Sequence, residues 1–454
     1  MTRDRAFLLR HPLAVAGIIL TTVTAVLFIA LAAAMFLDLL DNPYAGLVVF
    51  IGLPLIFVAG LLLIPIGMRL QRKALAEGRA SEDWPVFDFR QPHTRRMSLM
   101  VLSLTAINVI IVLVAGYGSL KWMESPEFCG AVCHEPMHPQ YTAWQDAPHS
   151  NIHCVDCHIG EGGRAFIKYK MAGVRQLYHV VTNAVPRPIP GVADMRLAFE
   201  TCGKCHWPGR SIGERVRVLR SYGDDEANTE SATALSMHLG GPNTPGGRGI
   251  HWHANPDLRI EYVYTDEERQ KIPWVHVTRP DGSSEEFVAE GVTRGQAPAG
   301  TQRRMDCIDC HNVVAHRIEP SAENAVDRAI ASGSVPASLP YVRREAVKLM
   351  QAKYDTTDAA LSAIDQGLRG FYKAQSGAVD AAALERAVTA LKTVYQRNVF
   401  PVMNVTFGTY PDNLGHTSSP GCFRCHDGSL TTKSGTSIPS DCETCHKMLE
   451  GVPQ

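Results

Sequence analysis

The sequence predicts a mainly α-helical protein with extensive irregular structure, in which three transmembrane helices precede an exported domain with a small β insert. Three observations predict this class. Three long apolar runs lie before residue 120, and the chain after it is polar and rich in glycine and proline. All twelve cysteines lie in that second part. The net charge of −1 gives no general field that would attract nucleic acid.

The apolar runs cover residues 13–36, 44–68 and 97–118. Each approaches or exceeds the roughly 20 apolar residues that cross a bilayer, so residues 1–120 are predicted to form a membrane domain. The first run is too long for a signal peptide and has no clear small-residue cleavage site after it. No charged residue lies deep in any run, which favours a simple anchor over a proton path.

The basic residues around these runs predict the orientation. Three arginines precede the first run, the "DLLDNP" turn has no lysine or arginine, and the 69–96 loop has seven basic residues. Cytoplasmic loops carry the excess of lysine and arginine, so the N-terminus and this loop are predicted to be cytoplasmic. Three crossings then place the chain after residue 120 in the periplasm of a bacterial inner membrane. The residues are Arg3, Arg5, Arg10, Arg69, Arg72, Lys73, Arg79, Arg90, Arg95 and Arg96.

The cysteines form six groups, each followed directly by histidine. Two thiols one short turn apart can form thioethers to the two vinyl groups of one haem, and the next histidine then lies under the iron. Zinc sites or disulfides are the alternatives, and neither explains six pairs that each precede a histidine. The sequence therefore predicts six covalently bound haem c groups, around which the exported chain is expected to wrap. The groups are Cys129/Cys133/His134, Cys154/Cys157/His158, Cys202/Cys205/His206, Cys307/Cys310/His311, Cys422/Cys425/His426 and Cys442/Cys445/His446.

The first four motifs lie in residues 121–319, and an insert at 211–306 carries none. Within the insert, "LRIEYVYT" alternates in the manner of a strand. "WVHVTRPDGSSEEFV" predicts a hairpin that turns at Pro280, Asp281 and Gly282. We therefore expect a small β element in this part of the chain.

A helical spacer is predicted for residues 320–400, and a segment with the last two motifs for 401–454. In "DAAALERAVTALKTVYQ" Asp380 is a plausible N-cap. The segment "TTDAALSAIDQGLRGFY" has a similar helical period. One face of the first of these helices would carry Leu384, Val388, Leu391 and Tyr395.

The second axial ligand of each iron decides its chemistry, because a closed haem carries electrons and an open one can bind small molecules. Ten histidines lie outside both the motifs and the cytoplasmic side. Together with Met137 they are numerous enough to close six haems, which argues against an open catalytic haem. They are His138, His149, His153, His179, His238, His251, His253, His276, His316 and His416.

Four ordered segments carry a family resemblance: "CGAVCHEPMHPQYTAWQDAPHSNIHCVDCH", "KYKMAGVRQLYHV", "ETCGKCH" and "CIDCHNVVAH". They resemble the NapC/NirT/NrfH family of membrane-anchored tetrahaem quinol dehydrogenases over roughly residues 121–210 and 307–316. The resemblance implies oxidation of quinol at the periplasmic face and electron delivery to a periplasmic partner. The third membrane helix and the two additional haems resemble the longer inner-membrane multihaem cytochromes.

The resemblance also implies particular ligands. Distal histidines are implied at His149, His179 and His316, and His238 is a fourth with weaker local support. Met137 takes the place of the family's methionine ligand to the first haem, one residue later than usual. A thioether raises the potential relative to a second imidazole, which would help this haem accept an electron.

A quinol site near Lys168 is implied as well, because the family has a lysine before the "LYH" histidine. The alternative is a lysine at the lipid headgroups. Arg175 stands where some members have an acidic residue, so the proton acceptor stays open. In the C-terminal part, His416 is one candidate distal ligand, and His251 or His253 is another.

The predicted function is therefore that of a hexahaem quinol dehydrogenase. Its expected partners are menaquinol or ubiquinol, a periplasmic redox protein or reductase, and membrane lipid, with no nucleic acid. Two other functions stay open. One is an electron-relay subunit of a larger respiratory complex without its own quinol site, and the other is a multihaem reductase with an open haem. Electron flow in the reverse direction, into the quinone pool, is a further variant.

Overall fold

The computed structural model divides into two compact units, Met1–Val132 and Cys133–Gln454. Several predictions fall outside the described residues: Cys133, the "DLLDNP" turn, and the basic residues of the N-terminus and of segment 78–88. The described residues are 11–36, 48–77, 89–132, 134–159, 163–192, 195, 197–206, 213–240, 249–375 and 379–451.

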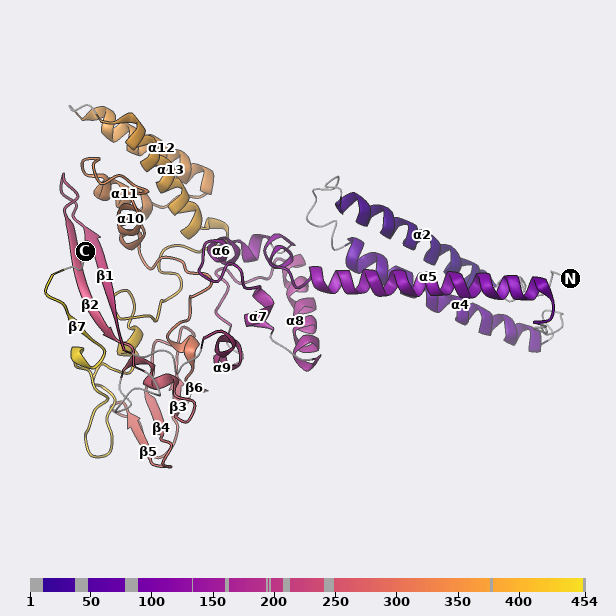
Figure 1. Ribbon diagram of the computed structural model, residues 1–454, viewed down its shortest axis with the longest axis horizontal. Coiled ribbons are helices and arrows are strands. Elements are labelled where there is room, and N and C mark those ends of the chain that lie inside the picture. The colour runs from indigo at the N-terminus through magenta and orange to yellow at the C-terminus, as the bar shows by residue number, and fades with distance from the viewer. Residues whose placement is uncertain are drawn as a thin grey trace. The chain divides into compact units, whose positions relative to one another are not determined.

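The first unit contains three long helices, α2 (Pro12–Phe36), α4 (Leu53–Ala76) and α5 (Pro92–Trp122). Helices α2 and α4 lie side by side (Figure 1). Their backbones approach closely at glycines: a Cβ added to Gly17 would lie 2.7 Å from the Gly60 carbonyl oxygen. Small residues at such contacts are typical of paired helices in membranes, where close backbone packing stabilises the pair.

Among the described residues, two helical segments are long and apolar enough to cross a membrane, Pro12–Leu31 and Leu53–Ala74. They coincide with the first two predicted spans. The third predicted span falls within α5, a single helix of 31 residues. The side chains of several α5 residues lie outside the description, so the third crossing stays a prediction.

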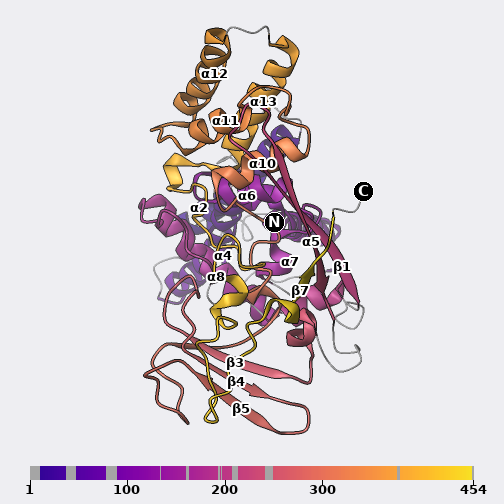
Figure 2. The same cartoon turned by 90° about the vertical axis from the view of Figure 1, so that its left-hand side faces the viewer.

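The second unit combines helices, two antiparallel sheets and long irregular segments. Figure 2 shows its helices α10–α13 at one end and strands β3–β5 at the other. The mainly helical class with irregular regions is thus confirmed. The helices are α6 (His134–Gln145), α7 (Cys154–His158), α8 (Gly163–Val181), α9 (Ala198–Thr201), α10 (Ala322–Ala331), α11 (Val342–Gln351), α12 (Thr357–Ala374) and α13 (Ala381–Asn398).

Helices α10–α13 form the larger hydrophobic core of this unit. Helix α13 begins where the sequence predicts, because the Asp380 side chain accepts a hydrogen bond from the Ala382 amide at 3.0 Å. On its predicted apolar face, Leu391 is fully buried and Leu384 is partly buried. The Thr356 hydroxyl caps α12 in the same way.

A four-stranded sheet forms the other end, in the order β5 (Ser284–Val288), β4 (Trp274–Thr278), β3 (Arg259–Tyr264), β6 (Thr301–Arg304). The predicted hairpin is confirmed: β4 and β5 pair, and the Arg279 amide donates to the Ser283 carbonyl at 2.8 Å. Gly282 has a φ of +81°, which a residue with a side chain adopts only with strain.

A second sheet was not predicted. Strands β1 (Glu214–Tyr222) and β2 (Glu230–His238) form a long hairpin, and β7 (His446–Met448) pairs with β2. The register places His446 opposite Met237. The last motif is therefore fixed to the insert by backbone hydrogen bonds, among them the one from the His238 amide to the Cys445 carbonyl.

Candidate functional site

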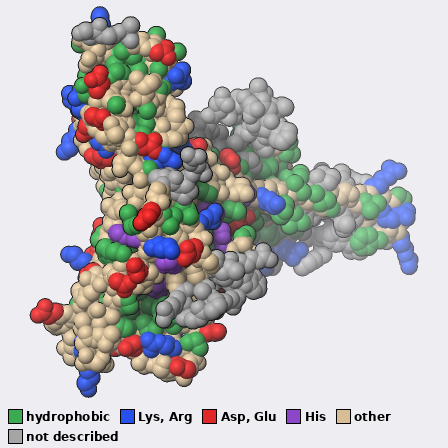
Figure 3. Space-filling model, turned by 60° about the vertical axis from the view of Figure 1, so that its left-hand side comes forward, with side chains coloured by type: hydrophobic (Ala, Val, Ile, Leu, Met, Phe, Trp, Pro, Cys, Tyr) green, Lys and Arg blue, Asp and Glu red, His purple; other side chains and the backbone are tan. Residues whose placement is uncertain are grey.

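Five motif histidines each face a histidine from a distant part of the chain. The separations between ring centres fall between 5.8 and 6.4 Å. Figure 3 shows histidine side chains gathered between the helical end and the sheet end of the second unit. The pairs are His158–His316 at 6.2 Å, His206–His149 at 6.0 Å, His311–His251 at 6.4 Å, His426–His253 at 5.8 Å and His446–His416 at 6.1 Å.

These separations fit an iron between each pair of imidazoles. An imidazole nitrogen binds a metal at about 2.0–2.1 Å and lies roughly 1.1 Å from the ring centre, so two imidazoles on opposite sides of one metal have centres about 6.2 Å apart. Among the described residues, no group of three or more His, Cys, Asp or Glu side chains is arranged to hold a metal ion. The arrangement therefore suits a flat group between two imidazoles better than a tetrahedral ion.

Burial keeps several of these imidazoles in the form that binds iron. Burial lowers the pKa of His316 to about 4, so its ring is neutral at pH 7 and has a lone pair. The same cause lowers the pKa of four further members of the pairs. They are His158, His251, His253 and His311.

The described cysteines form no disulfide. Burial raises the pKa of Cys310 and of Cys425 to about 12, so both are neutral thiols at pH 7. Apolar surroundings of this kind suit the edge of a porphyrin.

The third motif departs from this enclosure at Cys205. The Cys205 side chain is exposed, as is that of Cys442, whereas the other described cysteines are partly buried. Backbone hydrogen bonds fix the turn of the third motif. The amides of Cys205 and His206 both donate to the Cys202 carbonyl, at 3.2 and 2.8 Å, which keeps the two thiols one short turn apart.

Cysteines of successive motifs are neighbours in the fold. Cys202 and Cys307 share a hydrogen bond between their side chains. Burial and then the neighbouring Cys202 raise the pKa of Cys157. Burial and then Cys422 likewise raise the pKa of Cys445. With Cys310, whose pKa is raised by burial and then by Cys422, these contacts connect the second to sixth motifs in their chain order.

Buried charges hold the fourth motif in shape. Asp306 caps the turn Cys307–Asp309 by accepting a hydrogen bond from the Ile308 amide at 3.1 Å. The Tyr262 hydroxyl donates to Asp309 at 2.6 Å, and Arg303 donates to both carboxylates. Because both carboxylates are almost fully buried, the guanidinium is needed to offset the cost of removing their charge from water.

The first motif is only partly described. Cys129 lies in the π-helical turn Phe128–Val132, and α6 begins at His134. Cys133 and the side chain of His134 lie outside the described residues. Met137 lies in the first turn of α6 and is half-buried.

Two other predicted ligands have different surroundings. The His238 Nδ1 lies 3.1 Å from a Glu214 carboxylate oxygen at the edge of the β1–β2 hairpin. His179, on α8, is half-buried, and its Nδ1 has no hydrogen-bond partner among the described residues. Within the described part of the chain, neither faces a motif histidine.

Helix α8 also carries Lys168 and an exposed apolar stripe. Lys168 is exposed near its start. Met171, Val174, Tyr178 and Val181 follow at intervals of three or four residues and are 65%, 63%, 66% and 77% exposed. Apolar side chains on one face of a helix with basic residues are typical of a helix lying at a membrane surface.

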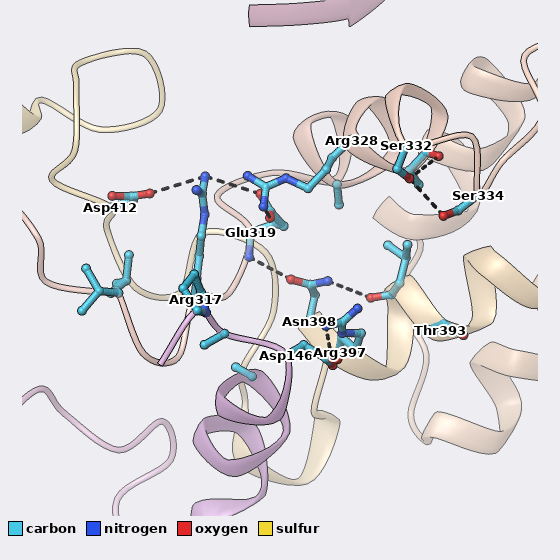
Figure 4. Close-up of a pocket in the computed structure, with 18 of the residues that line it drawn as sticks. Asp146, Arg317, Glu319, Arg328, Ser332, Ser334, Thr393, Arg397, Asn398 and Asp412 are labelled. Atoms are coloured by element: carbon cyan, nitrogen blue, oxygen red, sulfur yellow. Dashed lines mark hydrogen bonds and ion pairs between the residues drawn. The ribbon is translucent and has the colours of Figure 1, made fainter. Parts of the chain in front are cut away.

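A cavity of about 670 Å³ opens beside His149 and His311. Figure 4 shows its charged wall, where Arg317 lies between Glu319 and Asp412. The Arg317 guanidinium is 3.6 Å from the first carboxylate and 3.4 Å from the second. Its buried Nε has no hydrogen-bond partner among the described residues, so it can still donate to an anionic group.

Histidine pairs beside haem-attachment motifs, together with two apolar N-terminal helices, define a membrane-anchored multihaem c-type cytochrome that transfers electrons through covalently bound haem c. Comparison of the sequence with known protein families identifies the family. Residues 91–188 match the N-terminal region of the NapC/NirT cytochrome c family.

The chain belongs to this family. It is 37% identical over 466 residues to "Cytochrome c-type protein ImcH" of Geobacter sulfurreducens, an alignment that covers 100% of this chain and 91% of the relative. No solved structure matches the chain. The predicted family resemblance is thus confirmed.

Proposed function

We propose that the protein oxidises quinol at the periplasmic face of a bacterial inner membrane and passes electrons through six haem c groups to a periplasmic redox protein or reductase. The observation that carries this proposal is the row of histidine pairs on neighbouring motifs. When bound, haem c supplies one-electron exchange between ferric and ferrous iron. Two imidazoles on an iron leave no site for a substrate, which favours electron transfer over a reductase at these five haems.

Three of the pairs support ligands expected from the sequence. His316, His149 and His416 would be the distal ligands of the second, third and sixth haems. Met137 is retained as a ligand of the first haem, and His179 stays a candidate without an assigned iron. His238, whose Nδ1 lies 3.1 Å from a Glu214 carboxylate oxygen, also stays a candidate distal ligand without an assigned iron.

The membrane arrangement completes the proposal. Three crossings, the third within α5, would leave the N-terminus in the cytoplasm and the haem domains in the periplasm. The apolar stripe of α8 supports a position at the membrane surface, where a lipid-soluble quinol can reach the first haem. The quinol would be menaquinol or ubiquinol.

Quinol oxidation releases two electrons and two protons. The electrons would leave one at a time into the haem series, and the protons would enter the periplasm. The Lys168 ammonium would hold the quinol oxygen and stabilise the negative charge that develops as its proton leaves.

Replacing Lys168 with alanine is expected to slow quinol-driven haem reduction roughly ten- to hundredfold, less than the roughly hundred- to thousandfold effect of removing one charge-stabilising donor from an enclosed site, because Lys168 is exposed. Stopped-flow absorbance of the purified protein with a menaquinol analogue measures this rate. Lys170→Ala, on the same helix, is the matched control and should change the rate less than about twofold. Equal effects of the two variants would contradict a quinol site at Lys168.

The cavity arginine Arg317 would bind a haem carboxylate through its unpaired Nε. Arg317→Gln is expected to lower the midpoint potential of one haem by tens of millivolts, because losing a nearby positive charge favours the ferric iron. Spectroelectrochemical titration measures the shift. Arg328→Gln is the control: Arg328 is 60% exposed and paired with Glu319, so its loss should shift the potential much less. Equal shifts of the midpoint potential in the two variants would contradict the binding of a haem carboxylate by Arg317.

A further inference from the structure

The insert contains a short 3-10 helix, Ile250–Ala254, that presents two histidines to two different motifs. The His251 ring lies 6.4 Å from His311 of the fourth motif, with an angle of 13° between the ring planes. The His253 ring lies 5.8 Å from His426 of the fifth motif, with an angle of 78°. One turn therefore faces two motifs that are more than a hundred residues apart in the chain.

Hydrogen bonds orient the second of these pairs for iron. The His253 Nδ1 lies 2.8 Å from the Ile250 carbonyl, and the His426 Nδ1 lies 2.7 Å from the Pro439 carbonyl. A carbonyl only accepts, so each Nδ1 carries the proton and each Nε2 has the lone pair. Histidine ligands of metals are commonly held in this way.

The turn itself is fixed in place. The His251 amide donates to the Leu239 carbonyl at 2.8 Å, and Trp252 packs, as Cys425 does, on the core that includes Leu430. Gly249 enters the turn with a φ of +109°, and a Cβ there would lie 2.6 Å from the Gly240 Cα. Both the positive φ and the close approach require glycine at this position.

We infer that the turn Ile250–Ala254 is a double ligand clamp, in which His251 is the distal ligand of the fourth haem and His253 that of the fifth. The insert thus joins the family's tetrahaem part to the C-terminal pair of haems. The inference rests on the proposed function, because it takes haem c to be bound at these motifs.

The clamp would determine the electron path between the tetrahaem part and the C-terminal pair of haems. His251 would hold the fourth haem and His253 the fifth, and the two haems when bound would supply one-electron exchange between these parts of the chain. The attachment points of these two haems are near each other, since Cys422 helps to raise the pKa of Cys310, and Cys310 that of Cys425, in each case after burial.

Electron paramagnetic resonance of the full-length oxidised holoprotein tests the assignment without measuring activity. Near-perpendicular axial imidazoles give a highly anisotropic low-spin signal, and near-parallel imidazoles give a rhombic one. His253→Met is expected to remove one haem's intensity from the anisotropic signal. His251→Met is expected to remove one haem's intensity from the rhombic signal.

Two further sets of variants make the test decisive. His276→Met is the matched control, since His276 lies in the same insert but stacks on Trp274; its spectrum should equal that of the parent. His251→Gly and His253→Gly should regain the parent signal when imidazole is added, which a merely structural role would not allow.

Two results would contradict the assignment of His251 and His253 as ligands. A change of the fourth haem's signal in His238→Met, with none in His251→Met, would overturn the clamp. Failure of imidazole to restore the signal in a glycine variant that retains its haems would do the same. Haem content is measured on every sample, and fewer than six haems in the parent would count against the proposed function rather than the clamp alone.

Discussion

Replacing Cys422 and Cys425 together with alanine is expected to leave the sixth haem oxidised when quinol is added. The fifth motif is near both the fourth and the sixth, since Cys422 helps to raise the pKa of Cys310 and of Cys445, in each case after burial. Removing its haem therefore interrupts a series that we propose to run in chain order. Of the six motifs, five would still carry haem, and quinol would reduce only the four that precede the break.

The matched control replaces Cys442 and Cys445 with alanine. This variant also loses one haem, but at the end of the proposed series, so quinol should reduce all five that remain. Haem absorbance during anaerobic quinol titration gives the reduced fraction in both proteins. Complete reduction of the fifth-motif variant would show that electrons reach the sixth haem by another path, and the serial order would be wrong.

Replacing Met137 with histidine is expected to impair electron entry. Exchanging a thioether for an imidazole should lower the potential of the first haem by roughly 0.1–0.2 V, because the axial ligand is a main determinant of haem potential. The equilibrium constant for a one-electron transfer changes tenfold per about 59 mV, so the first transfer from quinol should become at least about fiftyfold less favourable. Potentiometric titration and the initial rate of quinol-driven reduction measure the two effects.

The variant Met137→Leu distinguishes iron binding by the Met137 sulfur from the packing of its side chain. Leucine fills a similar volume but cannot bind iron, so the near-infrared charge-transfer band of a thioether–iron bond should disappear while the other haems keep their potentials. If the band persists in Met137→Leu, or if no such band exists in the parent, Met137 is not a ligand and the expected potential difference has no basis.

Local sequence patterns predicted the elements whose signals lie within a few residues. Asp380 caps α13, and the hairpin turns at Gly282, because capping and turn geometry depend on neighbours in the chain. The β1–β2 hairpin was missed. In strand β1 Val216 and Val218 alternate with arginines over only a few residues, and the strand is largely exposed, so its signal for a half-buried strand is weak.

In the candidate site, too, the features encoded by neighbouring residues could be predicted, and those that depend on distant segments could not. The attachment motifs are local, and chemistry alone predicts them. The distal histidines come from remote segments: His253 faces His426, so spacing along the chain says nothing about which iron each would serve. The sequence could supply the candidates, but only the packing of the insert against the fourth and fifth motifs distinguishes His251 and His253 from His238.

The most direct test of the account is the number of porphyrins on the polypeptide. The full-length protein, purified from membranes, is examined by intact mass spectrometry with a parallel pyridine haemochrome assay. We expect a mass increase of six haem groups, one for each motif including the longer one at Cys129 and Cys133. A smaller increase, or stoichiometric zinc at these cysteines, would contradict a six-haem electron carrier.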